Sequence, residues 1–336
     1  MKKMNKMRIT AAALCLLVFS MTSCGTIAES IPVELPQLVV IDDVRIPLGA
    51  SPDLEPAELR PVIPPYMIKV PSLGMYYISH NGVTLDFSHS YNGYIMVRNE
   101  NPAQRSVAKI SLYGTEYVDI HTLNTYGNWD VLPITRGSGV YLVSVLEGTD
   151  DGGYWLNMVF DAAITIELIC CRMPFLYPNL YVNFNEYSYA VALAAELVSY
   201  ATSDLDAVLL IYNFITENIE YNHDFAYAVI QGYITEHIPN IDETLREGGG
   251  ICFDFAALMA AMLRSQHIPA RLEIGYVLEL YHAWVSVYML DTYVLPDEVS
   301  NGGWTLFDPT TTAYNIGKGH LPPIIEVYQY IMTSMR

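Results

Sequence analysis

The strongest constraint on the fold is a run of three glycines that leads into an apolar, Ala-rich segment. Gly248-Gly249-Gly250 is followed by residues 251–263, in which Ala and large apolar residues predominate. The glycines permit a tight turn, and the apolar segment predicts a buried helix. Cys252 then falls at the N-terminus of that helix. No Gly-Lys-Ser/Thr follows the glycines, so they do not form a phosphate-binding loop.

A cysteine at a helix N-terminus is placed to act as a nucleophile. Unpaired backbone N–H groups and the helix macrodipole favour an anion there. A free thiol has a pKa of ~8.5, and such a position with a neighbouring protonated histidine lowers it to about 3.5–7.5. The same N–H groups can receive the oxyanion that forms when a thiolate attacks a carbonyl. Taken alone, however, a Cys in an Ala-rich helix is more often a small packing residue.

Two segments downstream supply the partners that a thiol nucleophile needs. The expected strands are 270–277, 281–288 and 304–308. His282 lies near the start of the second strand, and Asp308 ends the third, directly before Pro309. If these strands pair antiparallel, His282 lies beside Asp308, and a carboxylate there fixes the imidazole tautomer and raises its pKa. Cys252, His282 and Asp308 then provide a nucleophile, a base and an orienting acid.

These motifs resemble the core of the transglutaminase-like superfamily. In chain order the matching segments are Gly250-x-Cys252-x-Asp254-Phe-Ala256, Ile268-Pro-Ala-Arg271, Gly275-Tyr276, His282-Ala-Trp284 and Trp304 with Asp308-Pro-Thr310. The preceding segment, 211–221, is also similar, and the resemblance spans roughly 186–314. It implies an α+β, papain-like transglutaminase core with helices packed on an antiparallel sheet. In that family Cys252 would be the catalytic nucleophile, His282 the general base and acid, and Asp308 the orienting residue.

The resemblance also directs attention to three neighbours of this triad. Trp284 is expected to pack beside His282, where it either shields the catalytic pair from water or simply belongs to the core. Tyr221 and Asn222 follow the helix that precedes the core. They are candidates for the second oxyanion donor or for the wall of the substrate groove.

No metal or cofactor is implied. The calcium-binding loops of animal members have no counterpart in this sequence, and neither Cys-x-x-Cys nor His-Glu-x-x-His occurs. Two departures from the family pattern are His267, where relatives often have Gly, and a short connection at 278–281. Because that connection helps to shape the substrate groove in many relatives, substrate specificity does not carry over.

Upstream of this core the chain favours strands. The expected strands include 139–146, 155–160 and 164–169, with a turn at 147–153. Short strands separated by Gly, Asn and Asp turns predict an all-β, sandwich-like domain over 66–173. A Tyr-rich stretch contains Tyr76, Tyr77, Tyr91 and Tyr94. These side chains could form a platform for a sugar or a peptide, although such residues more often pack against a sheet.

The transglutaminase-like domain is expected over 186–336. One apolar helix face comprises Val191, Ala194, Ala195 and Val198. Ser203 and Asp206 predict the start of the next helix, whose expected buried side comprises Leu205, Val208, Leu209, Tyr212, Ile215 and Ile219. Residues 221–250 are expected to form a loop. Cys170 and Cys171 end an apolar run, which favours buried packing over a vicinal disulfide.

The N-terminus has the pattern of an export signal. Residues 1–8 are basic, residues 9–21 are almost wholly apolar, and Cys24 follows Thr-Ser. This predicts a signal peptide over 1–23, and the Cys resembles the lipidated residue of a bacterial lipoprotein. An ordinary cleaved signal is the alternative. The Pro-rich segment 24–65 is the expected tether, so the protein is expected outside the cytoplasm, anchored to a bacterial membrane by lipid on Cys24.

Charge narrows the range of partners. The chain has 17 Lys and Arg against 36 Asp and Glu. Without the four basic residues of the segment 1–23, 13 basic residues remain against 36 acidic ones. Such an acidic chain repels phosphate groups, so nucleic acid is a poor partner. The expected partners are a protein or peptide substrate, with cell-wall peptide as one option, and the membrane through the N-terminal lipid. Peptidase or amidase activity is slightly favoured over cross-linking, and a non-catalytic lipoprotein whose β domain binds glycan or peptide is the alternative.

Overall fold

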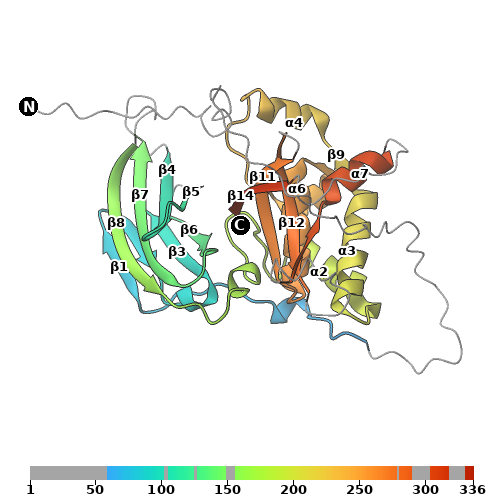
Figure 1. Ribbon diagram of the computed structural model, residues 1–336, viewed down its shortest axis with the longest axis horizontal. Coiled ribbons are helices and arrows are strands. Elements are labelled where there is room, and N and C mark those ends of the chain that lie inside the picture. Colours follow the sequence, from blue (N-terminus) through green and yellow to red (C-terminus); the bar gives the residue numbers. More distant parts are fainter. Residues whose placement is uncertain are drawn as a thin grey trace, which may run out of the picture.

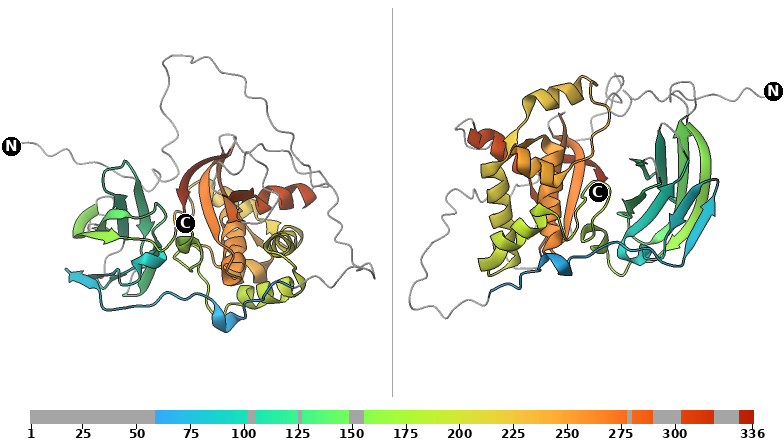
Figure 2. Two further views of the ribbon diagram at one scale, coloured as in Figure 1. Left: turned by 60° about the horizontal axis from the view of Figure 1, so that its bottom comes forward. Right: turned by 180° about the vertical axis from the view of Figure 1, so that it is seen from behind.

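The computed structural model describes residues 59–101, 105–124, 127–148, 156–277, 280–289, 303–317 and 330–336. They form two units that lie side by side, one a β-sandwich and the other a mixture of helices and strands (Figures 1 and 2). The predicted signal peptide, Cys24 and most of the predicted tether lie outside the described residues. Within the part that the structure describes, no helix is long and apolar enough to cross a membrane.

The first unit is built from two four-stranded antiparallel sheets, in the orders β1-β2-β3-β6 and β5-β4-β7-β8. The strands are β1 (Tyr77–His80), β2 (Val83–Asp86), β3 (Tyr94–Asn99), β4 (Ser106–Leu112), β5 (Val118–Thr122), β6 (Trp129–Pro133), β7 (Gly139–Gly148) and β8 (Leu156–Ile166). Side chains alternate between the two faces of a strand. In β7, Tyr141, Val143 and Val145 are buried, whereas Val140 and Leu142 are exposed. The predicted β-sandwich-like domain is therefore confirmed.

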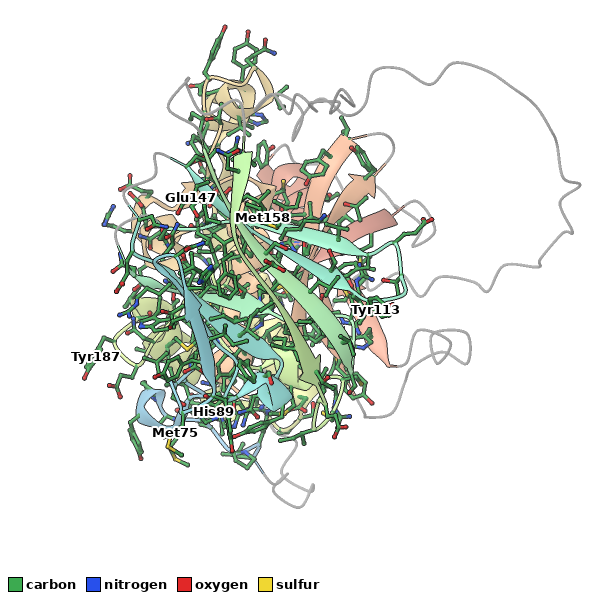
Figure 3. The ribbon with its side chains drawn as sticks, turned by 90° about the vertical axis from the view of Figure 1, so that its left-hand side faces the viewer. Met75, His89, Tyr113, Glu147, Met158 and Tyr187 are labelled. Carbon is green, nitrogen blue, oxygen red and sulfur yellow. The ribbon has the colours of Figure 1, made fainter. Side chains whose placement is uncertain are left out.

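Three details of this unit differ from expectation. In place of two strands at 155–160 and 164–169, the structure has one long strand, β8, over Leu156–Ile166. Cys170 is half-buried, Cys171 is exposed and both are free thiols, so buried packing and a vicinal disulfide are both wrong. The four tyrosines also do not form one surface, because Tyr76 and Tyr77 are exposed while Tyr94 is buried. Figure 3 shows the outer side of this unit, where Met75 and Met158 are exposed.

The second unit packs helices on a four-stranded antiparallel sheet of order β13-β12-β11-β14, as the predicted α+β fold requires. Its helices are α2 (Tyr189–Leu197), α3 (Asp204–Asn218), α4 (His223–Ile230), α5 (Ile241–Glu247), α6 (Cys252–Ser265) and α7 (Pro309–Gly317). Its strands are β9 (Glu220–Tyr221), β10 (Gly249–Gly250), β11 (Ala270–Val277), β12 (Leu280–Tyr288), β13 (Trp304–Phe307) and β14 (Tyr330–Met335). Short 3₁₀ turns lie at Pro65–Met67, Ser90–Asn92, Met173–Phe175 and Val198–Tyr200.

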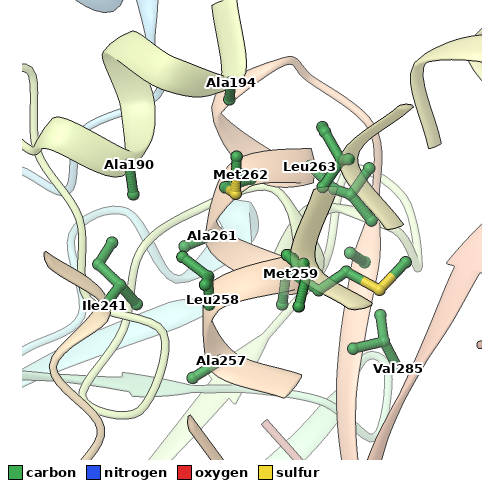
Figure 4. Close-up of a cluster of buried hydrophobic side chains, with 14 of the residues drawn as sticks. Ala190, Ala194, Ile241, Ala257, Leu258, Met259, Ala261, Met262, Leu263 and Val285 are labelled. Carbon is green, nitrogen blue, oxygen red and sulfur yellow. The ribbon is translucent and has the colours of Figure 1, made fainter. Parts of the chain in front are cut away.

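Helix α6 is the centre of the second unit. Every residue from Asp254 to Ser265 is buried. Figure 4 shows Leu258, Met259, Met262 and Leu263 projecting from this helix among the apolar side chains of its neighbours. The small alanines of α6 permit close approach of the surrounding helices and of the sheet. The predicted buried helix that begins at Cys252 is therefore confirmed.

Other helices were only partly anticipated. Ser203 caps α3 as predicted, because its side chain accepts the backbone N–H of Asp206 at 3.1 Å. Leu205 of that helix is exposed, contrary to its predicted burial. The expected loop 221–250 contains α4 and α5, whose N-caps are Asn222 and Asn240.

The end of the predicted tether is bound to the second unit. The backbone N–H of Arg60 donates to the carbonyl of Ala201 at 2.8 Å, and the Arg60 side chain forms an ion pair with Asp204. Ile63 exchanges two hydrogen bonds of 3.0 Å with the side chain of Gln266. Residues 60–63 are thus packed in place, in contrast to the free linker that was expected.

Candidate active site

Cys252 opens helix α6, and glycines shape the approach to it. Gly248 ends α5 with a φ of 61°, the left-handed region that favours glycine. Gly250 pairs with Tyr221 in a short parallel ladder. A Cβ at Gly250 would lie 2.7 Å from the Cβ of Asp254, so only glycine lets that carboxylate turn back. Asp254 there accepts the backbone N–H of Ile251 at 2.9 Å, which fixes the start of the helix.

His282 and Asp308 meet across two paired strands. Val285 of β12 lies opposite Phe307 of β13, which makes His282 and Asp308 diagonal neighbours on one face. The distance from His282 Nε2 to Asp308 Oδ2 is 2.9 Å. The predicted antiparallel pairing and the predicted contact are both present.

The His282 ring also contacts the thiol. Burial disfavours its charged form, but hydrogen bonds and charge attraction from Asp308 and Cys252 prevail and raise the pKa of His282 to about 10. Because Nε2 faces Asp308, Nδ1 is the ring nitrogen that remains for Cys252. At neutral pH the ring is therefore an imidazolium held between a thiol and a carboxylate. The structure brings the three predicted catalytic residues together.

Asp308 is fixed by the helix that follows it. It precedes α7, and its Oδ1 accepts the backbone N–H of Thr311 at 3.0 Å, while Oδ2 accepts the Thr311 hydroxyl at 2.7 Å. Burial opposes its ionisation, yet the hydrogen bonds from His282 and Thr311 keep the pKa of Asp308 below its usual value. Pro309 occupies the first helical position, where its missing N–H costs nothing. The strand ends at Phe307, one residue earlier than expected, and the helix that begins at Pro309 was not predicted.

Trp284 lies beside the catalytic pair as expected. Its ring stacks on His282 with an interplanar angle of 23° and a centroid distance of 6.3 Å. The indole N–H donates to Glu273 Oε2 at 2.7 Å, and the hydroxyl of Ser286 donates to the same oxygen at 2.8 Å. Burial raises the pKa of Glu273, although these two bonds oppose the rise. Trp284 is thus locked in position from both sides, and it covers one face of the His282 ring.

Tyr221 and Asn222 lie next to the segment that leads to Cys252. The backbone N–H of Asn222 donates to the carbonyl of Gly250 at 2.8 Å. The side-chain oxygen of Asn222 accepts the N–H of Phe225 at 2.9 Å and thereby caps α4. Tyr221 packs against the core and meets the ring of His223 edge-on at 5.0 Å. An oxyanion or groove role for either residue remains a prediction.

Sequence reasoning missed several supporting residues. Thr311 and Glu273 hold the triad and its tryptophan, and His237 bonds to Asp254 at 2.7 Å. Only the Asp-Pro-Thr sequence, a helix-start signal, could have pointed to Thr311. Over the residues that the structure describes, no group of three or more His, Cys, Asp or Glu side chains could hold a metal ion.

The arrangement is that of an activated thiol. The sulfur of Cys252 at a helix start contacts an imidazolium, and the imidazolium is oriented by a buried carboxylate. The first N–H groups of an α-helix generally lack an acceptor within the helix and point toward its N-terminus, which is where Cys252 lies in α6. Such a site can attack a carbonyl carbon and stabilise the oxyanion that results.

Comparison with known proteins finds similar solved structures and one family match. Several solved structures are similar, including a candidate cysteine protease from Cytophaga hutchinsonii (17% identity over 73% of this chain and 76% of that one, TM-score 0.38). Another is the periplasmic domain of TgpA from Pseudomonas aeruginosa (16% identity over 70% of this chain and 72% of that one, TM-score 0.31). A third is red sea bream transglutaminase (13% identity over 72% of this chain and 49% of that one, TM-score 0.30). No curated protein sequence matches this chain. Residues 191–309, which lie within the second unit, match the family model of the transglutaminase-like superfamily.

Proposed function

We propose that the protein is a thiol enzyme that cleaves or transfers amide-linked acyl groups through a thioester on Cys252. The observation that carries the proposal is the contact of Cys252 with His282, whose charged form is stabilised by Asp308 2.9 Å away. A thiolate beside an imidazolium needs no further activation before it attacks a carbonyl. The family of residues 191–309 agrees with cysteine-based chemistry.

The reaction has two halves. Cys252 Sγ bonds to the carbonyl carbon, and the carbonyl electrons move to its oxygen, which the N–H groups at the start of α6 receive. As the oxyanion collapses, the C–N bond breaks, the amine takes the proton from His282 Nδ1, and a thioester remains. Neutral His282 then removes a proton from water or from an acceptor amine, which attacks the thioester and releases the thiolate.

Hydrolysis is favoured over amine transfer because water needs no second binding site. The proposed substrate is a protein or peptide, with cell-wall peptide as one candidate. We also propose that the enzyme works at the outer face of a bacterial membrane, held by lipid on Cys24. That part of the proposal rests on the sequence of the first 24 residues. It is tested by growing cells that express wild type or C24A with an alkyne fatty acid: the wild-type protein should carry the label, and the C24A variant should not.

The activity is tested with glutamine-containing peptides and a dansyl amine, analysed by mass spectrometry. Wild-type protein should yield deamidated glutamine or new termini, and a smaller amount of amine-labelled product. The C252A variant should yield none of these products, while C171S, which removes an exposed thiol, should be fully active. Equal product from wild type and C252A would refute the proposal.

A binding role for the β-sandwich is the second candidate. Tyr76 and Tyr77 are exposed next to each other at the start of β1, and exposed aromatic side chains suit glycan or peptide ligands. If this were the whole function, C252A would keep the cellular phenotype and any ligand binding of the wild type.

A further inference from the structure

A second histidine lies close to the start of the catalytic helix. His237 belongs to the segment between α4 and α5, and its Nε2 lies 2.7 Å from Asp254 Oδ1. Asp254 is two residues beyond Cys252 and is buried. Its other oxygen accepts the N–H of Ile251, the residue before the helix. One carboxylate therefore joins His237 to the backbone that carries the nucleophile.

The ring of His237 is fixed by more than this hydrogen bond. Phe225 of α4 meets it edge-on with a centroid distance of 4.9 Å, and Phe253, the residue after Cys252, meets it at 6.3 Å. The adjacent Glu236 lies 3.9 Å from Arg105 of the β-sandwich unit. The segment that carries His237 is thus held between α4, the start of α6 and the sandwich.

Asp254 needs an outside partner to serve as an anchor. A carboxylate accepts several hydrogen bonds, and with only one donor it could rotate away from Ile251. Ile251 has no side-chain oxygen to complete a capping box. The bond to His237 fixes the second oxygen, so the carboxylate plane and the position of Cys252 are set together.

We propose that His237 is a positioning residue: by its hydrogen bond it holds Asp254 against the start of α6, and so keeps Cys252 in reach of His282. It does not touch the reacting atoms. This inference rests on the proposed function, because it assigns His237 a part in the reactivity of the same thiol.

Alkylation of Cys252 by iodoacetamide at neutral pH, located by peptide mapping, tests the proposal without a known substrate. H237L should slow alkylation about tenfold, equivalent to about 1.4 kcal/mol. H237Q, whose amide can still donate to Asp254, should stay within about twofold of wild type. H89L is the matched control, because the His89 ring bonds to Tyr91 within the sandwich, and it should have no effect.

A double-variant cycle shows whether the effect passes through Asp254. D254A, which removes both acceptor oxygens, should slow alkylation, and H237L added to D254A should slow it no further. Should H237L fail to fold, H237E replaces it, since Glu is isosteric with Gln but cannot donate when ionised. Wild-type rates in H237L or H237E, equal loss in H237Q and H237L, or multiplying effects in the double variant would overturn the proposal. Failure of the proposed function looks different: wild-type Cys252 would then react no faster than the exposed Cys171.

Discussion

Replacing Asp308 by Asn tests the electrostatics of the site most sharply. Raising the pKa of His282 from 6.5 to about 10 corresponds to about 5 kcal/mol in favour of the charged ring, at 1.36 kcal/mol per pH unit. The favourable part comes from Asp308 and Cys252, with the Asp308 hydrogen bond the larger. Removing the charge of Asp308 should therefore remove roughly half or more of this stabilisation of the charged His282 ring, about 2–3 kcal/mol.

The assay is the pH profile of Cys252 alkylation. In the wild type the alkylation rate should persist well below pH 7, because His282 stays charged beside Cys252 throughout that range. In D308N the pKa of His282 falls, the ion pair weakens, and the rate near pH 6 should drop roughly a hundredfold, at 1.4 kcal/mol per tenfold. Asn can still accept the Thr311 N–H, so α7 should keep its cap.

A matched control separates this effect from the loss of any buried carboxylate. Asp130 is buried in the sandwich and bonded to Asn124, so D130N should leave the alkylation profile unchanged. Superimposable pH profiles of Cys252 alkylation for wild type and D308N would refute the reasoning, because the Asp308 carboxylate would then not stabilise the charged His282 ring.

Three further predictions follow from the same contacts. G250A should displace the Asp254 carboxylate, since its Cβ would lie 2.7 Å from the Asp254 Cβ, and circular dichroism should show an intact fold while alkylation of Cys252 slows. R264M should lower the free energy of urea unfolding by about 3–5 kcal/mol, because the buried Arg264 side chain donates to three backbone carbonyls, those of Ala270, Tyr177 and Arg336; a loss below about 1 kcal/mol would contradict that role. The contribution of charged His282 to the free energy of unfolding should be fully present below pH 6.5 and lost as the pH rises toward about 10, since the pKa of His282 is raised in the folded state. The free energies of urea unfolding of wild type and H282Q should therefore converge as the pH approaches 10. A difference that stays constant with pH would argue against the ion pair.

The sequence was most informative where a local pattern and its tertiary role coincide. Cys252 follows glycines and opens an apolar helix, and residues 281–288, which include His282, favour a strand. Both patterns persist in the fold because α6 and β12 pack directly on each other within one core. The pairing that brings His282 to Asp308 follows from antiparallel neighbours, which is the commonest arrangement for consecutive strands.

Other features depended on contacts between distant residues. Helices α4 and α5 are only eight and seven residues long, too short for a clear apolar period, although Asn222 and Asn240 were available as cap signals. His237 meets Asp254, and Arg264 meets Arg336, across long separations in the chain. No local pattern encodes such pairs, because they are set by how the core packs.

The central claim is that Cys252 forms the acyl-enzyme, and trapping that species tests it most directly. The protein is mixed with an activated ester, quenched in acid and mapped by mass spectrometry. We predict acyl mass on the peptide that contains Cys252, strongly reduced in H282A and absent in C252A. Acylation confined to Cys170 and Cys171, the other free thiols among the described residues, or equal labelling of Cys252 in wild type and H282A, would contradict the account.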